Sequence, residues 1–343
     1  MVTVSFPGLG IEPFTFDKVA LRLPIFGGIE VRWYGIIIVT GIILAFLYAT
    51  WRAKQSGIVL DDMLDIAIWA VLFGMIGART YYVLTSLDEF DSFWEALAIW
   101  NGGIAIYGSI IGGAAAILVV CRIKKLKWQT IFDCVSPGVM IGQILGRWGN
   151  FFNGEAYGET PAEGSPLYFL RMGLQHEGWK KEIFYQPTFL YESLWNLIGF
   201  LLIHFTYKKK KFEGQIFLEY ITWYGFGRML IEGLRTDSLY IGVFRISQVV
   251  GFCCFVIGGT LLIILSIRAK KQYLATEADY DSVYGNLVRE RAENAPKVAV
   301  PAPTDTPAAE APAPDEPPAE GKTPAPEEPT QDNTGEQNDH AES

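Results

Sequence analysis

The segment WYGIIIVTGIILAFLYATW, residues 33–51, contains no charged side chain. A helix needs about twenty mostly apolar residues to cross the hydrocarbon core of a bilayer. We therefore predict that this segment is a membrane-spanning helix. It places the chain among membrane proteins.

Six further segments have the same character. Residues 102–121 and 246–267 are free of charged residues, and the others carry only isolated ones. Gly108 and Gly112 suit the close approach of two helices in lipid. We predict an all-α polytopic membrane protein with seven transmembrane helices at 33–51, 66–84, 102–121, 128–146, 187–207, 214–234 and 246–267.

Lysine and arginine residues follow every second predicted span, whereas the loop after the second span has none. Short cytoplasmic loops of membrane proteins are enriched in these residues. The N-terminus is therefore predicted outside, the C-terminus in the cytoplasm, and the longest loop, 148–186, outside. The basic residues are Arg52, Lys54, Arg122, Lys124, Lys125, Lys127, Lys208, Lys209, Lys210, Lys211, Arg268, Lys270 and Lys271.

The formal net charge of −9 belongs to the end of the 343-residue chain. Residues 296–343 contain eleven acidic and two basic residues and eleven of the eighteen prolines, so residues 1–295 are neutral overall. We predict that this acidic tail is disordered, because it has too little apolar surface to fold. The balance argues against a nucleic-acid partner, and the scattered histidines and unpaired cysteines argue against a metal site.

Two segments flank the predicted helical body. Short alternating stretches in residues 1–32 indicate an extended outer or interfacial arm. Residues 272–295 are polar and charged, which suggests a cytoplasmic juxtamembrane segment with a short helix. The predicted organisation is an arm at 1–32, a seven-helix catalytic domain at 33–271, a juxtamembrane segment at 272–295 and a tail at 296–343.

Charged residues within predicted spans are costly and are therefore candidates for function. In the sixth span Tyr220, Tyr224, Arg228 and Glu232 recur every four residues and share one helical face. Arg228 and Glu232 have the spacing of an ion pair within one helix. Such a pair either fixes helix packing or forms a polar wall of a cavity in the lipid, and the pattern alone leaves both readings open.

A second cluster lies where the fourth span meets the outer surface. The segment GQILGRWGNFFNGEAYG, residues 142–158, surrounds four polar side chains with glycines that permit turns and close approach. An arginine at head-group depth offers forked donors to a phosphate. An ordinary helix-ending turn is the alternative interpretation. The candidate residues in this segment are Arg147, Asn150, Asn153 and Glu155.

Three more segments open predicted spans at the same outer level. QPTFLYE (186–192) brings Glu192, NGGIAIYG (101–108) brings Tyr107, and WYG (33–35) brings Tyr34. A snorkelling carboxylate and an interfacial aromatic anchor are the simpler explanations for Glu192 and for the Trp33–Tyr34 pair. Taken together, the clusters predict a membrane-embedded cavity, open to the outer side, that suits a phospholipid head group.

The run GRWGNFFNGEAYG, residues 146–158, resembles the signature of the bacterial phosphatidylglycerol–prolipoprotein diacylglyceryl transferase family. The resemblance extends over roughly residues 15–270, and the same seven-helix topology is the family's. Other segments match in order: RWYG (32–35), GGIAIYG (102–108), PTFLYE (187–192) and YGFGR (224–228), with Glu232 and Arg235.

This resemblance implies the reaction. The diacylglyceryl group of phosphatidylglycerol would move to the lipobox cysteine thiol of an exported prolipoprotein, forming a thioether and releasing glycerol 1-phosphate. The substrate thiolate is the nucleophile. The implied setting is the bacterial inner or plasma membrane, with several passes through the bilayer and without a cofactor or metal.

The resemblance also implies roles for individual residues. Paired essential arginines fall on Arg147 and Arg228, with Arg147 on the phosphate of phosphatidylglycerol. The implied catalytic residues are Arg147, Arg228, Tyr107, Glu155 and Asn150, and the implied substrate-binding residues are Arg147, Arg228, Tyr34, Asn153, Gly158, Tyr224, Glu192, Glu232 and Arg235.

Two positions depart from the family pattern. Some members have histidine, proposed as the base, where this chain has Tyr107, and Gln186 stands where histidine is often found. A tyrosine with an ordinary pKa of about 10 is a poor base near neutral pH. Either Tyr107 is tuned by Arg147 or Arg228, or another group takes the proton.

Two other functions are compatible with parts of the sequence. A transporter or flippase for an anionic lipid or solute would use the same arginines and glutamates for passage, but it would be expected to contain repeats with broken helices near the midplane. A scaffold whose acidic tail recruits partners would explain the tail but not the polar clusters.

Overall fold

The computed structural model describes residues 1–24, 28–90, 92–236 and 239–293. The predicted acidic tail, 296–343, lies outside the described residues. The chain divides into two compact units, Met1–Tyr284 and Gly285–Ser343, and the features discussed below belong to the first, apart from the last residues of the final long helix.

Seven long helices overlap the seven predicted spans, with one short helix, α3 (Phe93–Leu97), between the second and third. Within the described residues, α1, α4, α6 with the turn after it, and α8 are long and apolar enough to cross a membrane. The chain is therefore mainly helical, and its four candidate spans are consistent with a polytopic membrane protein. The long helices are α1 (Trp33–Gln55), α2 (Leu60–Thr85), α4 (Ile106–Lys124), α5 (Trp128–Asn153), α6 (Thr188–Thr206), α7 (Gln215–Ile231) and α8 (Ile246–Glu293).

Several predicted boundaries were wrong. The fourth span was expected to end at Gly146, with an outer loop over 148–186, but α5 runs to Asn153, so the first residues of that loop are helical. The third span was expected to begin at Gly102, but α4 begins at Ile106, because Gly102 and Gly103 have positive φ angles of 87° and 75°. The sixth was expected to reach Leu234, but α7 ends at Ile231 and a 3-10 turn follows. The short helix expected beyond residue 272 is a continuation of α8.

Helices α2 and α4 pack through glycines, as the Gly108 and Gly112 spacing predicted. A Cβ atom on Gly108 would lie 2.2 Å from the carbonyl oxygen of Gly77, and one on Gly112 would lie 2.2 Å from that of Phe73. The two backbones are therefore in direct contact, which is how small residues stabilise helix pairs in lipid. Helix α1 packs against α5, α5 against α6, and α6 against α7.

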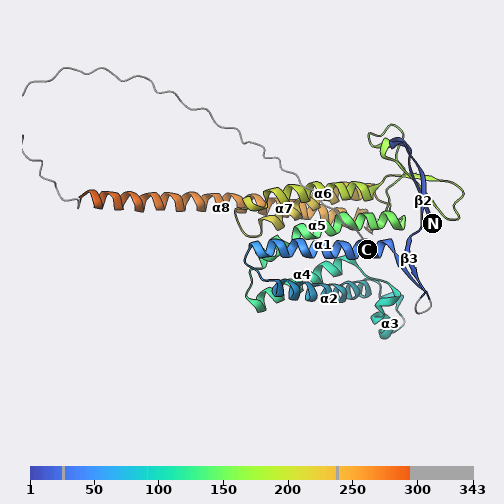
Figure 1. Cartoon of the computed structure of the whole chain (residues 1–343), viewed down its shortest axis with the longest axis horizontal. Coiled ribbons are helices and arrows are strands. Elements are labelled where there is room, and N and C mark those ends of the chain that lie inside the picture. The colour runs from blue at the N-terminus through green and yellow to red at the C-terminus, as the bar shows by residue number, and fades with distance from the viewer. Residues whose placement is uncertain (25–27, 91, 237–238, 294–343) are drawn as a thin grey trace, which may run out of the picture. The chain divides into compact units, whose positions relative to one another are not determined.

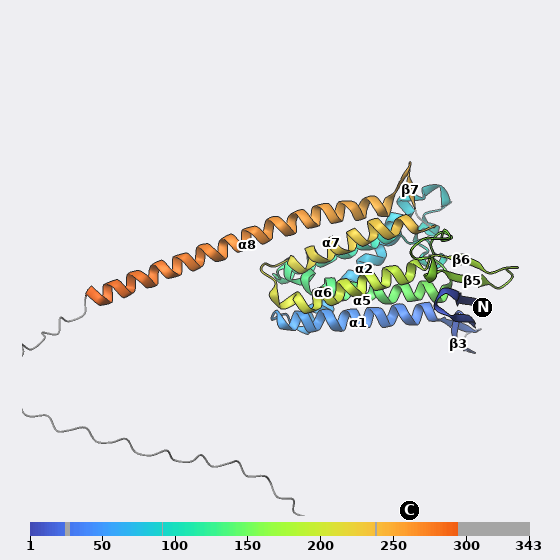
Figure 2. The same cartoon turned by 90° about the horizontal axis from the view of Figure 1, so that it is seen from above.

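Ion pairs gather the basic helix ends at one end of the bundle. Lys124 lies 2.7 Å from Asp62, Lys127 lies 3.0 Å from Glu213, and Lys210 lies 3.1 Å from Asp133. The loops α1–α2, α4–α5 and α6–α7 therefore share that end, and the strands lie at the other (Figures 1 and 2).

The strand end holds a small sheet that sequence patterning did not predict. Strands β1 (Val2–Phe6) and β2 (Ile11–Phe16) from the N-terminal arm pair with β5 (Met172–His176) and β6 (Ile183–Tyr185) from the long loop, in the antiparallel order β2-β1-β5-β6. The arm also forms the hairpin β3 (Val19–Leu23) and β4 (Ile29–Arg32), and a third hairpin, β7 (Tyr240–Ile241) and β8 (Phe244–Arg245), precedes α8. Two distant segments thus form one platform over the helix ends.

Candidate active site

The centre of the candidate site is the carboxylate of Glu192, in the first turns of α6. The side chain of Glu192 is only 5% exposed. One oxygen, Oε2, lies 2.6 Å from Nη2 of Arg147, and the other, Oε1, lies 2.9 Å from Nη1 of Arg228 and 3.1 Å from Nη1 of Arg235. One carboxylate therefore joins arginines from α5, from α7 and from the turn after α7.

A second carboxylate completes this cluster. Arg228 Nη2 lies 2.6 Å from Glu232 Oε2, the i, i+4 pair that the sequence spacing predicted. The five side chains are three arginines and two glutamates, so the cluster has a formal charge of +1. A buried cluster with one excess positive charge suits a ligand that carries one negative charge, because an unpaired buried charge is costly.

The glycine-rich segment adds a chain of amides to the same cluster. Arg147 Nη1 donates to Asn150 Oδ1 at 3.2 Å, and the amide nitrogens of Asn150 and Asn153 both donate to Glu155 Oε1 at 3.1 Å. Glu155 is exposed, directly after the end of α5. The four candidate residues of this segment are thus connected to one another and, through Arg147, to Glu192.

Backbone contacts hold the loop that follows. The N–H of Gly158 donates to the carbonyl of Gln186 at 2.9 Å, and Gly158 forms an isolated bridge with Arg235. Thr188, fully buried at the start of α6, donates to the carbonyl of Ala156 at 2.8 Å. Gln186, where the resemblance marked a departure, therefore contributes its backbone carbonyl to the loop.

The outer sheet supports the turn at the end of α5. His176 of β5 lies against Gly154, whose φ is +63°. Burial, and next the nearby Lys18, lower the pKa of His176 below its ordinary value. The imidazole therefore stays neutral at physiological pH, and no charge from this side chain enters the cluster next to it.

The two remaining tyrosines predicted for the site lie on its borders. Tyr224 is one turn before Arg228 on α7, and its ring stacks on that of Tyr220 with centroids 5.9 Å apart. Tyr34, at the outer end of α1, is 37% exposed, and its ring lies against Gly149 of α5. The roles of Tyr34 and Tyr224 in the site stay predictions.

Tyr107 is held by a residue that the sequence analysis did not single out. Its hydroxyl lies 3.0 Å from Oγ of Ser247, at the start of α8, 140 positions away in the chain. The hydrogen bond joins the outer ends of α4 and α8. No motif marked Ser247, so this contact had no signal in the sequence.

We expect Tyr107→Phe and Ser247→Ala to lower the transfer rate by the same modest factor. Each change removes the same hydrogen bond, worth about 1 kcal/mol or roughly fivefold in rate. The measurement is the pH dependence of kcat for both variants. A loss far larger in Tyr107→Phe than in Ser247→Ala, with a changed alkaline limb, would instead identify Tyr107 as the base.

Arg79 of α2 anchors the loop that carries the 102–108 motif. Its guanidinium donates to four backbone carbonyls, those of Glu95 and Ala96 at 2.9 and 2.7 Å, and those of Gly102 and Gly103 at 2.6 and 2.8 Å. The side chain is 7% exposed. This arginine, predicted only as an isolated charge within a span, therefore holds α3 and the motif against α2.

Arg79→Lys is expected to loosen this loop, because an ammonium cannot reach four carbonyls with the planar fork of an arginine. Amide hydrogen exchange in residues 95–105 should become faster, while exchange in α5 and α6 stays unchanged. Arg245→Lys, an arginine on the β7–β8 hairpin, is the matched control. Unchanged exchange in the loop of Arg79→Lys would refute the anchoring role.

Among the described residues, no group of three or more His, Cys, Asp or Glu side chains is placed to hold a metal ion. The cluster can act electrostatically. Its arginine guanidinium groups can bind a phosphate and stabilise the negative charge that the phosphate gains as it leaves. Carboxylates beside them fix the guanidinium planes.

Comparisons with known proteins agree with this chemistry. A sequence model of the family described as prolipoprotein diacylglyceryl transferase matches residues 19–264. Relatives named phosphatidylglycerol–prolipoprotein diacylglyceryl transferase occur in Streptococcus pneumoniae serotype 4, 43% identical over 77% of this chain and 99% of the relative, and in Listeria welshimeri, 39% identical over 78% and 95%. A third, from Listeria monocytogenes serotype 4a, is 37% identical over 83% of this chain and the whole relative. The chain therefore belongs to the prolipoprotein diacylglyceryl transferase family.

Proposed function

We propose that this chain transfers the diacylglyceryl group of phosphatidylglycerol to the lipobox cysteine thiol of exported prolipoproteins. The convergence of Arg147, Arg228 and Arg235 on Glu192 carries the proposal. The two substrates are those that the names of the relatives give. The cluster's formal charge of +1 complements the single negative charge of a phosphodiester.

The proposed reaction moves negative charge from the thiolate sulfur to the departing phosphate. The thiolate sulfur attacks the diacylglyceryl carbon that is bonded to the phosphate oxygen, the new C–S bond forms, and the C–O bond breaks. Glycerol 1-phosphate leaves with the electron pair, and the thiol proton goes to a base. Because the phosphate gains negative charge as it leaves, arginines beside it bind the transition state more strongly than the substrate.

In this scheme Arg147 and Arg228 hold the phosphate. Glu192 and Glu232 orient the guanidinium groups, and Arg235 balances Glu192. Asn150, Asn153 and Glu155 position Arg147 from the outer side, while Tyr34, Tyr224 and the backbone of Gly158 border the lipid head group. These roles, and a cavity open to the outer surface, are parts of the proposal.

We also propose that all seven long helices cross a bacterial cell membrane, with the N-terminus outside. The four most apolar helices and the clustering of basic residues at one end support this. The cluster then lies near the outer ends of α5, α6 and α7. That depth suits a phospholipid of the outer leaflet and a prolipoprotein that has just been exported.

The experiment mixes purified protein with phosphatidylglycerol and a lipobox peptide and measures the peptide mass. We expect the peptide to gain one diacylglyceryl group. A peptide with serine in place of cysteine, and phosphatidylcholine in place of phosphatidylglycerol, are the controls. If no adduct forms where a related transferase makes one, the proposal is wrong, and translocation of phosphatidylglycerol without product would favour the flippase alternative.

A further inference from the structure

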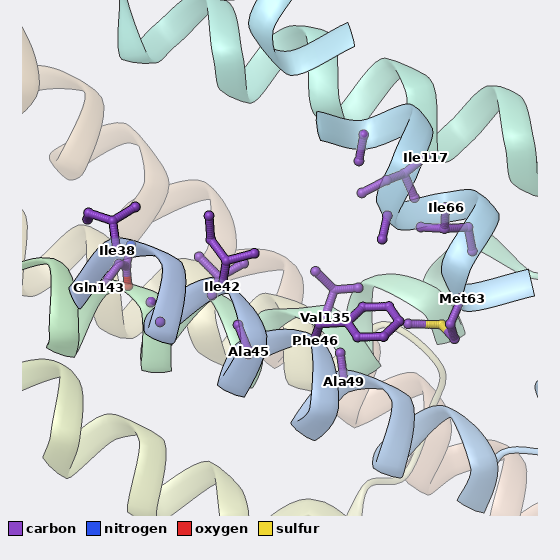
Figure 3. Close-up of a pocket in the computed structure, with 16 residues that line it drawn as sticks. Ile38, Ile42, Ala45, Phe46, Ala49, Met63, Ile66, Ile117, Val135 and Gln143 are labelled. Atoms are coloured by element: carbon purple, nitrogen blue, oxygen red, sulfur yellow. The ribbon is translucent and has the colours of Figure 1, made fainter. Parts of the chain in front are cut away.

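An apolar pocket lies between α1, α2 and α5, below the arginine cluster. Its volume is about 440 Å³, and its lining is almost entirely aliphatic (Figure 3). Residues from α1, α2, α4 and α5 form its walls, and two of them, Ile42 of α1 and Val139 of α5, are exposed on the outside of the bundle. The pocket is therefore an apolar groove in the part of the protein that faces lipid. Characteristic lining residues are Ile38, Ile42, Phe46, Met63, Val135 and Gln143.

The groove has the length of one leaflet's acyl chain. Along α1 it is lined from Ile38 to Ala49, and at about 1.5 Å per residue this is roughly 16 Å. A hydrocarbon core about 30 Å thick leaves about 15 Å for each leaflet. Its inner end is lined by Met63 and Ile66 of α2, both 2% exposed and part of a buried core cluster.

The outer end of the groove meets the arginine cluster. Gln143, which lines the groove, lies one helical turn before Arg147 on α5. Its Nε2 donates to the hydroxyl of Tyr220 at 3.0 Å. Its Oε1 is buried and has no hydrogen-bond partner in the part of the chain that the structure describes. Along α5, the apolar lining of the groove is therefore followed directly by the polar residues of the arginine cluster.

We infer that this groove binds one acyl chain of the phospholipid whose phosphate is held by Arg147. The inference rests on the proposed function and adds a site to it. An acyl chain fits in length and polarity, whereas a helical peptide segment, about 10 Å across, would need the space of a whole helix. The buried side chains at the inner end limit the length of the acyl chain that the groove accepts.

Gly142 offers a direct way to fill the groove. It lines the pocket, and a Cβ atom added to it would meet no atom within 4 Å. Gly142→Leu therefore puts a side chain into the groove without a backbone clash. Ala67→Leu fills the groove from α2 and serves as a second variant. Ala115→Leu, on an exposed part of α4 away from this groove, adds the same bulk as a control.

The primary experiment needs no substitution. The full chain in phosphatidylcholine nanodiscs is given phosphatidylglycerol with a photoreactive diazirine halfway along one acyl chain, and adducts are mapped by mass spectrometry. We expect adducts concentrated on residues 38–49 and 135–143. Adducts spread evenly over the exposed residues of all helices would overturn the inference, because they would report ordinary lipid around the protein.

The variants give a second readout. Gly142→Leu and Ala67→Leu should reduce groove adducts and lower transfer from dipalmitoyl phosphatidylglycerol by about tenfold, a loss of about 1.4 kcal/mol, while transfer from the dihexanoyl lipid is retained. Ala115→Leu should match the wild type with both lipids. If both groove variants, in properly folded protein, lose activity equally with both lipids, the groove does not bind the acyl chain. Failure of the proposed function is distinct: product is then absent in the wild type while the adduct map still reports binding.

Discussion

Arg147→Ala and Arg228→Ala are each expected to lower kcat for diacylglyceryl transfer by at least about 10²–10³-fold, the loss typical of removing one preorganised group that stabilises developing charge. Arg228 contacts both carboxylates of the cluster, and Arg147 joins Glu192 to the amide chain of Asn150. Either change therefore removes a proposed phosphate ligand and lowers the formal charge of the cluster from +1 to 0, so that the cluster no longer complements a phosphodiester. We expect the loss in Arg228→Ala to be the larger.

A lysine variant and a control at an exposed arginine test this prediction further. Arg228→Lys keeps the charge but loses the fork that spans Glu192 and Glu232, so it should recover only part of the activity. Arg22→Ala, which removes exposed ion pairs with Asp17 and Glu30 in the N-terminal arm, should behave as wild type. Near-normal turnover in Arg147→Ala or Arg228→Ala, with Tm confirming a folded protein, would refute the phosphate-holding role.

Glu192→Gln is the second change with a large expected effect. It removes the acceptor shared by three arginines and raises the formal charge of the cluster from +1 to +2. The guanidinium groups then repel one another and lose their fixed orientation. We expect kcat to fall by about 10²-fold or more, as for other groups that orient charge at a reacting centre, while KM for phosphatidylglycerol does not rise, because more positive charge faces the phosphate.

The split between kcat and KM distinguishes orientation from simple loss of the fold. Thermal unfolding should also be measured, since breaking a buried ion pair costs about 3–5 kcal/mol. Glu219→Gln is the matched control, because Glu219 is a partly buried glutamate of α7 that accepts a hydrogen bond from Gln215 at 2.8 Å. A rise in KM with unchanged kcat would contradict the orienting role of Glu192.

The helices and the charge pair were predictable because their signals are local. Apolar runs of membrane-spanning length mark the helices, and the four-residue spacing of Arg228 and Glu232 marks their ion pair, which is present. The glycine spacing near Gly108 likewise predicted a close approach of two helices, and the structure shows that the partner is α2. The prediction that the arginine and glutamate clusters meet also holds, since Glu192 joins Arg147 and Arg228 directly.

The remaining features depend on contacts between residues far apart in the chain. Glu192 could have been a snorkelling carboxylate, and only the packing of α6 against α5 and α7 makes it the centre of the cluster. Ser247 meets Tyr107 across 140 residues, and β1 pairs with β5 across about 170. The start of α4 was misplaced because apolar residues continue through Gly102 and Gly103, whose backbone conformations are not helical.

In the proposed reaction, the C–O bond between the diacylglyceryl group and the phosphate breaks while Arg147 and Arg228 hold the phosphate. The most direct measurement uses phosphatidylglycerol with an isotope-labelled head group and quantifies the lipidated peptide and the released head group in one reaction. We expect one labelled glycerol 1-phosphate for each thioether-linked diacylglyceryl peptide, and no label on the peptide. A peptide that carries labelled phosphate, or one that carries a single acyl group as a thioester, would contradict it.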